Sequence, residues 1–97
     1  MAMAETGYIV RAYRYPVLPA ASPDWESTPY ARIEPIKRSA RSHYLAHNAR
    51  YRYEIQAVEV GKKDGAVQVL SRKTLLEATP EPGTARIRWV SRENRGE

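Results

Sequence analysis

Two histidines, His43 and His47, are separated by four positions. On a helix this spacing places both rings on one face, where they could ligate a zinc ion. No Glu–His pairing and no third histidine accompany them. We therefore interpret both as surface histidines, and the sequence predicts no metal site and no cofactor.

Residue types used in nucleophilic catalysis are present without the patterns that organise them. Serine, histidine and aspartate occur, but no segment reads as a nucleophile elbow or an oriented triad. The five glycines stand singly and are typical of turns rather than of a phosphate-binding loop. Cysteine is absent, which excludes thiolate chemistry and disulfides. The sequence thus predicts a protein that is not an enzyme and has no small-molecule substrate.

Arginines and tyrosines interleave at residues 11–15 and again at residues 50–53. Such a mixture can bind single-stranded nucleic acid, because the rings stack on bases and the cations pair with phosphates. Strand alternation offers a simpler interpretation, with the tyrosines of 51–53 facing a core and the arginines facing solvent. The last apolar strand is flanked by arginines in the same way. The candidate polyanion contacts are Arg50, Arg52, Arg86 and Arg88.

The chain of 97 residues is basic, with 16 Lys and Arg against 11 Asp and Glu and a net charge of +5. A hydrophobic fraction of 42% fits one globular domain over residues 1–97. The charge balance favours a polyanionic partner such as nucleic acid or an acidic protein surface. We find neither an apolar run of about 20 residues nor a signal-peptide pattern, so we expect no membrane partner and a cytoplasmic or virion-associated location.

Most of the local patterns predict strands. Residues 7–15 are β-branched and aromatic, and residues 51–60 alternate with period two. Asp64-Gly65 is a turn pair that should join residues 51–60 to residues 66–71 as a β-hairpin. Residues 25–36 read as an extended edge strand, because Pro29 and Pro35 suit an edge. Residues 38–50 fit either a short helix or a strand followed by a turn.

A leucine and a tyrosine six positions apart, Leu45 and Tyr51, precede the alternating residues Tyr53, Ile55 and Ala57. This stretch resembles the E–F corner and F strand of fibronectin type III domains, although residues 47–49 depart from the usual Pro-Gly-Thr turn. The resemblance implies that the Tyr51 hydroxyl bonds back to upstream backbone as a tyrosine corner. The residues that it places in the core are Leu45, Tyr51, Tyr53 and Ile55.

The rest of the chain resembles the same family in a different order. Residues 7–72 look like strands C to G, with Trp25 in the C′ region, and residues 74–92 look like strands A and B, with Trp89 as the core tryptophan. The resemblance implies an all-β immunoglobulin or fibronectin III-like sandwich in the permuted order C-C′-E-F-G-A-B. Such a sandwich closes on itself or is completed by strand exchange with a neighbour.

Linker length favours strand exchange. A strand of eight residues spans about 26 Å, whereas the residues between 71 and 75 reach only about 10–14 Å. We therefore expect residues 74–92 to be donated head to tail to a neighbouring copy, which gives a ring or a fibre. Two alternatives remain open, namely closure within one chain and a small α+β domain with a helix at 38–50. The candidate assembly interface is Leu75, Leu76, Ile87 and Trp89.

Two functions follow from these interpretations. The first is a non-enzymatic structural module, such as a virion or fibre component, that forms homo-oligomers by β-hairpin donation. The alternative is a small basic protein that binds nucleic acid or an acidic protein surface, for example a phage-type inhibitor. Salt separates them, because polyanion binding weakens steeply with ionic strength and strand exchange does not.

Overall fold

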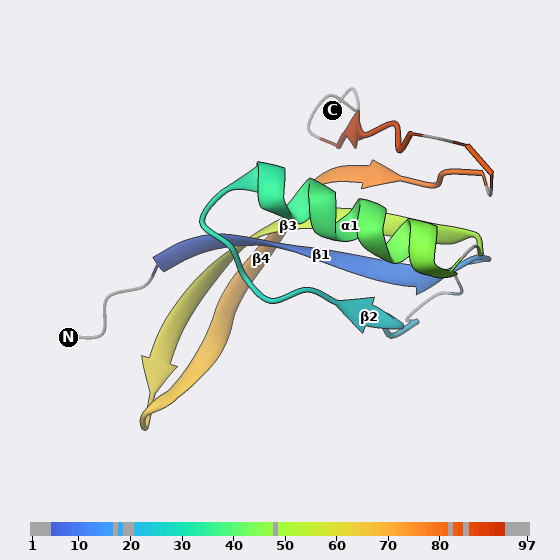
Figure 1. The fold of residues 1–97 in the computed structure, drawn as a ribbon. Coiled ribbons are helices and arrows are strands. Elements are labelled where there is room, and N and C mark those ends of the chain that lie inside the picture. Colours follow the sequence, from blue (N-terminus) through green and yellow to red (C-terminus); the bar gives the residue numbers. More distant parts are fainter. Residues whose placement is uncertain are drawn as a thin grey trace.

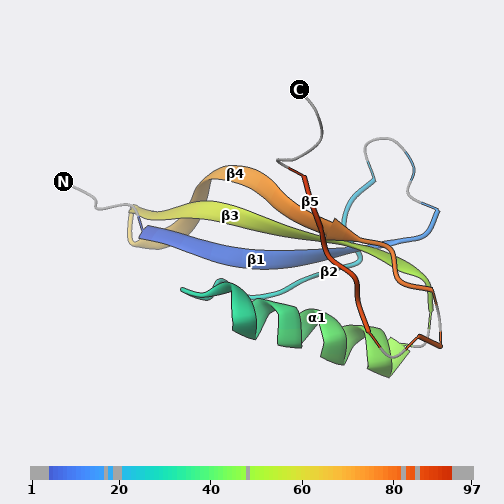
Figure 2. The same ribbon diagram turned by 90° about the horizontal axis from the view of Figure 1, so that it is seen from above.

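One antiparallel sheet and one helix make up the structure, a computed structural model that describes residues 5–16, 18, 21–47, 49–81, 83–84 and 86–92. The strands lie in the order β2-β1-β3-β4-β5, and each neighbouring pair is antiparallel. Helix α1 lies along one face of the sheet (Figures 1 and 2). The elements are β1 (Glu5–Arg14), β2 (Trp25–Glu26), α1 (Ile33–His47), β3 (Tyr51–Lys63), β4 (Ala66–Ala78) and β5 (Val90–Ser91).

The core lies between α1 and the central strands. Val10 and Ala12 of β1 stand opposite Ile55 and Tyr53 of β3, and all four side chains are fully buried. Because successive strand residues point to opposite faces, this alternation gives β3 one apolar face for the helix. The helix contributes four buried residues at helical spacing, of which Ile36, Ala40 and Tyr44 belong to the hydrophobic core and the fourth is His43.

Residues 38–50, whose structure the sequence left open, are helical up to His47. Residues 25–26 form β2, and Tyr30 still pairs with Tyr8 of β1 in an isolated bridge, but the helix begins at Ile33, so the edge strand predicted for residues 25–36 is wrong from Ile33 onward. Proline is tolerated in the first turn of a helix, where its missing N–H has no partner to lose. Pro35 therefore does not prevent a helix whose apolar positions face the sheet.

The predicted hairpin between residues 51–60 and 66–71 is confirmed and is longer than expected. Asp64 and Gly65 both have positive φ, of 54° and 80°, as a two-residue type I′ turn requires. The first residue of β1, Glu5, pairs with Val60. In the described part of the chain, the hairpin therefore continues past β1 as a two-stranded arm, residues 60–70, which projects from the body (Figure 1).

Strand β4 runs without interruption from Ala66 to Ala78, which corrects the predicted division between residues 72 and 74. Two β-bulges lie on either side of the residues where a break between two strands was expected. The pairs Glu59↔Ser71 and Val60↔Val69 leave Leu70 as an extra residue, and a second register shift leaves Leu75 extra. A bulge lets apolar residues of one strand change face while the ladder continues. The change in the alternation of apolar residues near position 73 therefore occurs within one strand, not between two strands.

The prediction of a β-rich fold is confirmed, since a single antiparallel sheet holds all the described strands. A two-sheet sandwich is not confirmed, because the second layer over the described core is helix α1. After β4 the chain passes the end of α1 and returns to β5 (Figure 2). Along this return, Ile87 and Trp89 pack against the core of their own chain. Strand exchange was expected because a short linker was thought to separate residues 71 and 75. These residues belong to one continuous strand, β4, so the structure has no such linker.

Candidate functional site

A buried tyrosine fastens the returning C-terminal segment to the helix. The Tyr44 hydroxyl lies 2.6 Å from the carbonyl oxygen of Glu81 and 2.9 Å from that of Thr84. Tyr44 has only 4% of its surface exposed, so these contacts satisfy a hydroxyl that would otherwise be costly to bury. They fix the position of residues 86–89 beside α1.

A groove lies between α1 and residues 86–89, and we call it the C-terminal groove. Its volume is about 350 Å³, and it is lined by Lys37, Arg38, Arg41, Arg86, Ile87 and Trp89. The helix residues among these run from the flank of α1 beside buried Tyr44, where Lys37 lies, to its outer face, where Arg38 lies. Trp89 is half-buried and lies edge-on to Tyr53, with ring centroids 6.5 Å apart. The groove thus combines apolar side chains with cations.

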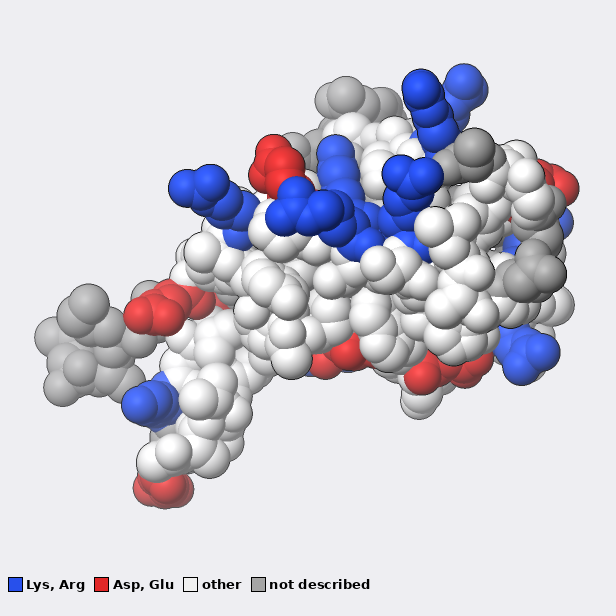
Figure 3. Space-filling view, in the orientation of Figure 1, with Lys and Arg blue, Asp and Glu red and all other residues white. Residues whose placement is uncertain are grey.

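Five cations of this region, which we call the groove cations, have no carboxylate partner in the described part of the chain: Lys37, Arg38, Arg41, Arg86 and Arg88. All five side chains are exposed. Figure 3 shows Lys and Arg side chains gathered in a band over this side of the molecule, with one acidic side chain beside them and the other acidic side chains at the lower margin and the ends of the molecule. The band presents a positive field to solvent.

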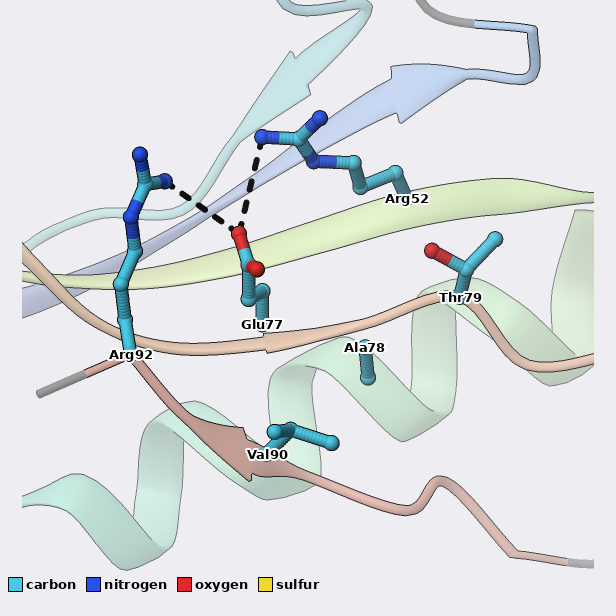
Figure 4. A pocket seen from close by; sticks show the side chains of 6 residues that line it. All are labelled: Arg52, Glu77, Ala78, Thr79, Val90 and Arg92. Atoms are coloured by element: carbon cyan, nitrogen blue, oxygen red, sulfur yellow. Dashed lines mark hydrogen bonds and ion pairs between the residues drawn. The ribbon is translucent and has the colours of Figure 1, made fainter. Parts of the chain in front are cut away.

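The other face of the sheet has the opposite arrangement. Glu77 is 8% exposed and lies between two arginines, 3.6 Å from Arg52 and 3.3 Å from Arg92 (Figure 4). Arg52 also pairs with Glu54, which is buried as well. Toward β2, Glu26 accepts hydrogen bonds from Arg11 at 2.6 Å and from Arg72 at 3.3 Å. These cations neutralise carboxylates of their own chain.

A stack of rings fills the space between β2 and the end of α1. The His43 ring lies between Trp25 and His47, at centroid distances of 4.5 and 4.0 Å. Its Nδ1 is 2.9 Å from the Tyr53 hydroxyl, while His47 Nδ1 donates to the His43 carbonyl oxygen. Burial, followed by the charge of His47, lowers the pKa of His43 despite an opposing effect of Asp24. His43 is therefore a neutral core residue at pH 7.

The described residues contain no group of three or more His, Cys, Asp or Glu side chains that could hold a metal ion. Within the same residues, the structure has no helix of the length and hydropathy needed to cross a bilayer.

The four predicted polyanion contacts lie in two different environments, one open to a partner and one already ion-paired. Arg86 lines the C-terminal groove, and Arg88 is exposed two residues further along the same segment. Arg50 instead pairs with Glu81 at 3.2 Å and lies over the Tyr15 ring at 4.2 Å, and Arg52 belongs to the Glu77 cluster. Sequence reasoning did not select Lys37, Arg38 and Arg41. Their spacing would have marked them, had residues 38–50 been taken as a helix with one basic face.

The predicted core residues are also divided. Tyr51, Tyr53 and Ile55 are buried, but Leu45 is 59% exposed, because it follows Tyr44 on the helix and lies about 100° further around the helix axis, on the outer side. The hydroxyl bond to upstream backbone that was predicted for Tyr51 has no counterpart at Tyr44, whose hydroxyl donates instead to the downstream carbonyl oxygens of Glu81 and Thr84.

Three of the four predicted interface residues pack against the core of their own chain, which are Leu76, Ile87 and Trp89. Leu75 is the second bulge of β4, and its carbonyl oxygen accepts a hydrogen bond from the Arg92 backbone N–H.

Comparisons with protein-family models, with curated proteins and with solved structures found no match to this chain. The resemblance to fibronectin type III domains therefore stays a prediction, and the function is argued from the site itself.

Proposed function

We propose that this protein is a non-enzymatic nucleic-acid-binding module whose contact surface is the C-terminal groove and the groove cations around it. The observation that carries the proposal is the concentration, on one side of the molecule, of five cations that form no ion pair with a described carboxylate. Cations held near one another repel, so such a cluster is favourable when it meets a polyanion.

Nucleic acid fits this surface better than an acidic protein does. Four of the five groove cations are arginines, whose planar fork binds phosphate oxygens in a bidentate manner. The groove also contains Trp89 and Ile87, which offer an apolar surface to a base. An acidic protein surface would use the charges but would leave this apolar surface without a specific partner.

Salt dependence of binding tests the proposal. If all five groove cations contact phosphates, the logarithm of the binding constant should fall against the logarithm of salt concentration with a slope of about −3.5 to −4.5. The double variant with Lys37→Ala and Arg41→Ala should reduce the steepness by roughly 1.4–1.8 and weaken binding at every salt concentration. Fluorescence anisotropy with a labelled oligonucleotide measures both quantities.

Lys62→Ala is the matched control, because Lys62 is exposed on the β3–β4 arm, away from α1 (Figure 1). It removes one positive charge without touching the groove. Equal losses in the control and in a single Lys37→Ala variant would show that only net charge matters, and the proposed surface would then be wrong.

A second candidate function, homo-oligomeric assembly, rests on the arm. Val67 and Leu70 are 64% and 56% exposed there, and Val69 is also exposed. Beyond β3, the strand pairing of β4 in the described residues is with β5 at Leu76 and Glu77, so the backbone edge of residues 66–72 is paired with no described strand. An antiparallel edge can pair with the same edge of a second copy around a two-fold axis, which buries these side chains.

Light scattering across a range of protein concentrations tests this assembly. We expect a dimer that persists at high salt and that Val67→Lys converts to a monomer, since an edge lysine opposes strand pairing. A parent protein that stays monomeric at all concentrations would overturn the assembly and leave the binding proposal intact.

A further inference from the structure

Both tryptophans of the chain line grooves beside helix α1, one on each side. Trp89 lines the C-terminal groove. Trp25 lines a second groove of about 550 Å³, the β2 groove, together with Tyr30, Ser39, Ser42 and His43. Tryptophan is the side chain best suited to cover a base or another flat ring. The sequence has only two tryptophans, and each lines one of the two grooves, so the two grooves suit the same type of ligand.

One residue connects the two grooves. Arg38 lines both of them, because it stands on the exposed ridge of α1 that separates them. Its guanidinium has no ion-pair partner among the described residues. An extended ligand that passes over the helix at Arg38 would therefore contact both grooves.

The β2 groove is built for a flat polar ligand. The Trp25 ring is held in place by its stack on His43, with an interplanar angle of 19°. Tyr30 is anchored through two backbone hydrogen bonds to Tyr8, and its side chain is 42% exposed. The hydroxyls of Ser39 and Ser42 add donors and acceptors on the helix side. Rigid aromatic side chains lose little conformational entropy when a ligand binds.

We propose that a single strand of nucleic acid crosses α1 at Arg38, with a base against Trp25 on one side and a base against Trp89 on the other. Arg38 contacts the backbone phosphate at the crossing, and Lys37, Arg41 and Arg86 contact the phosphates next to the C-terminal groove. This inference rests on the proposed nucleic-acid-binding function and specifies the form of the ligand and its path.

A duplex would not use these features. In a double helix the faces of the bases are stacked inside, so neither tryptophan could cover a base. A duplex would meet α1 through phosphates alone or through groove edges. The two aromatic grooves therefore favour an unpaired strand, whose bases are free to stack on side chains.

Intrinsic fluorescence reports each groove separately, because each contains one of the two tryptophans. Trp25→Phe leaves Trp89 as the reporter, and Trp89→Phe leaves Trp25. Phenylalanine keeps a flat apolar ring, so both variants should fold and still bind, although more weakly than the parent because the smaller ring covers less of a base. Titration with a single-stranded DNA oligonucleotide should quench the remaining tryptophan in both proteins. Arg38→Ala should weaken binding at least fivefold, whereas Lys62→Ala should change it less than twofold.

Three ligands separate the possible outcomes: the single-stranded oligonucleotide, a hairpin duplex of the same length and poly-glutamate. Quenching in both single-tryptophan proteins, with the duplex bound at least tenfold more weakly, is the expected result. Quenching of Trp89 alone would overturn the path across the helix and leave the nucleic-acid function standing. Equal or tighter duplex binding would overturn the single-strand inference in the same way. Absence of nucleic-acid binding, or tighter binding of poly-glutamate, would overturn the proposed function as well.

Discussion

The two faces of this small protein use the same side chains in opposite ways. On the open face of the sheet, arginines are paired with partly or fully buried carboxylates, as in the cluster of Arg52, Glu77 and Arg92. On the helix side, the groove cations form no ion pair with a described carboxylate. Charge on the first face contributes to the fold, and charge on the second is available to a partner. Net charge alone would not have distinguished them.

The largest effect should come from removing the carboxylate at the centre of the sheet-face cluster. Glu77→Ala leaves Arg52 and Arg92 without this shared partner at a site where the carboxylate is 8% exposed. Both arginines remain partly solvated, so we expect a loss of about 2 kcal/mol in the free energy of unfolding, below the range for fully buried pairs. For a domain of this size the melting temperature should fall by roughly 8–16 °C. Thermal unfolding by circular dichroism measures this, and a fall below about 2 °C would place the cluster with ordinary surface ion pairs.

The hydroxyl of Tyr44 should have a smaller effect on stability and an additional effect on binding. Tyr44→Phe removes the hydrogen bonds to the Glu81 and Thr84 carbonyl oxygens, at a cost of about 1 kcal/mol in unfolding free energy. Because these bonds hold the segment that carries Arg86 and Trp89, oligonucleotide affinity should also fall. Tyr15→Phe is the control, since Tyr15 is exposed and its ring keeps the contact with Arg50. Unchanged affinity in Tyr44→Phe would mean that the groove does not depend on this tie.

Acidification should destabilise the ring stack under the β2 groove. The pKa of His43 is lower in the folded protein than in the unfolded chain, mainly because of burial. Between those two pKa values the unfolded state binds more protons, so stability falls as pH drops below the ordinary histidine value of about 6.5. The neighbouring groups are Asp24, His47, Tyr51 and Tyr53.

Urea unfolding at pH 7.5 and pH 5.5 measures this effect. His43→Gln should remove most of the difference in unfolding free energy between the two pH values. His47→Gln should keep most of it, because burial is the largest cause of the lowered pKa. A parent protein of equal stability at both pH values would contradict a buried neutral His43.

The local patterns predicted the strands and the hairpin turn better than they predicted how the elements combine. The alternation in residues 51–60 and the Asp64-Gly65 pair fixed β3 and its turn, since both signals are local. The bulges at Leu70 and Leu75 were invisible, because an extra residue in one strand looks like the end of one strand and the start of another. That ambiguity produced the prediction of a donated hairpin.

Only part of the candidate site was predicted from the sequence, for a related reason. Arg86 and Arg88 stood out next to an apolar alternation, but Arg38 and Arg41 fell in the segment whose helix or strand state was open. A basic face exists only once the helix is known, because residues three and four positions apart become neighbours on its surface. Sequence reasoning also could not predict that Arg50 is ion-paired while Arg86 lines the groove, since the partner of Arg50, Glu81, lies 31 positions away in the sequence.

The smallest effect on stability should also be the one that separates the two faces most clearly. Lys37 and Arg41 are four residues apart on α1, where like charges destabilise a helix by a few tenths of a kcal/mol. Lys37→Glu replaces this repulsion with a Glu–Arg pair in the favourable orientation but places a second carboxylate three residues after Glu34, so the two effects oppose each other and the unfolding free energy should change by less than about 0.5 kcal/mol. The same change reverses a charge at the C-terminal groove, and oligonucleotide affinity should fall at least tenfold. Urea midpoints and fluorescence anisotropy on the same preparation measure both quantities. Unchanged affinity would mean that the helix face binds no phosphate, whereas a large loss of affinity at nearly unchanged stability would show that the charge of Lys37 serves a partner rather than the fold.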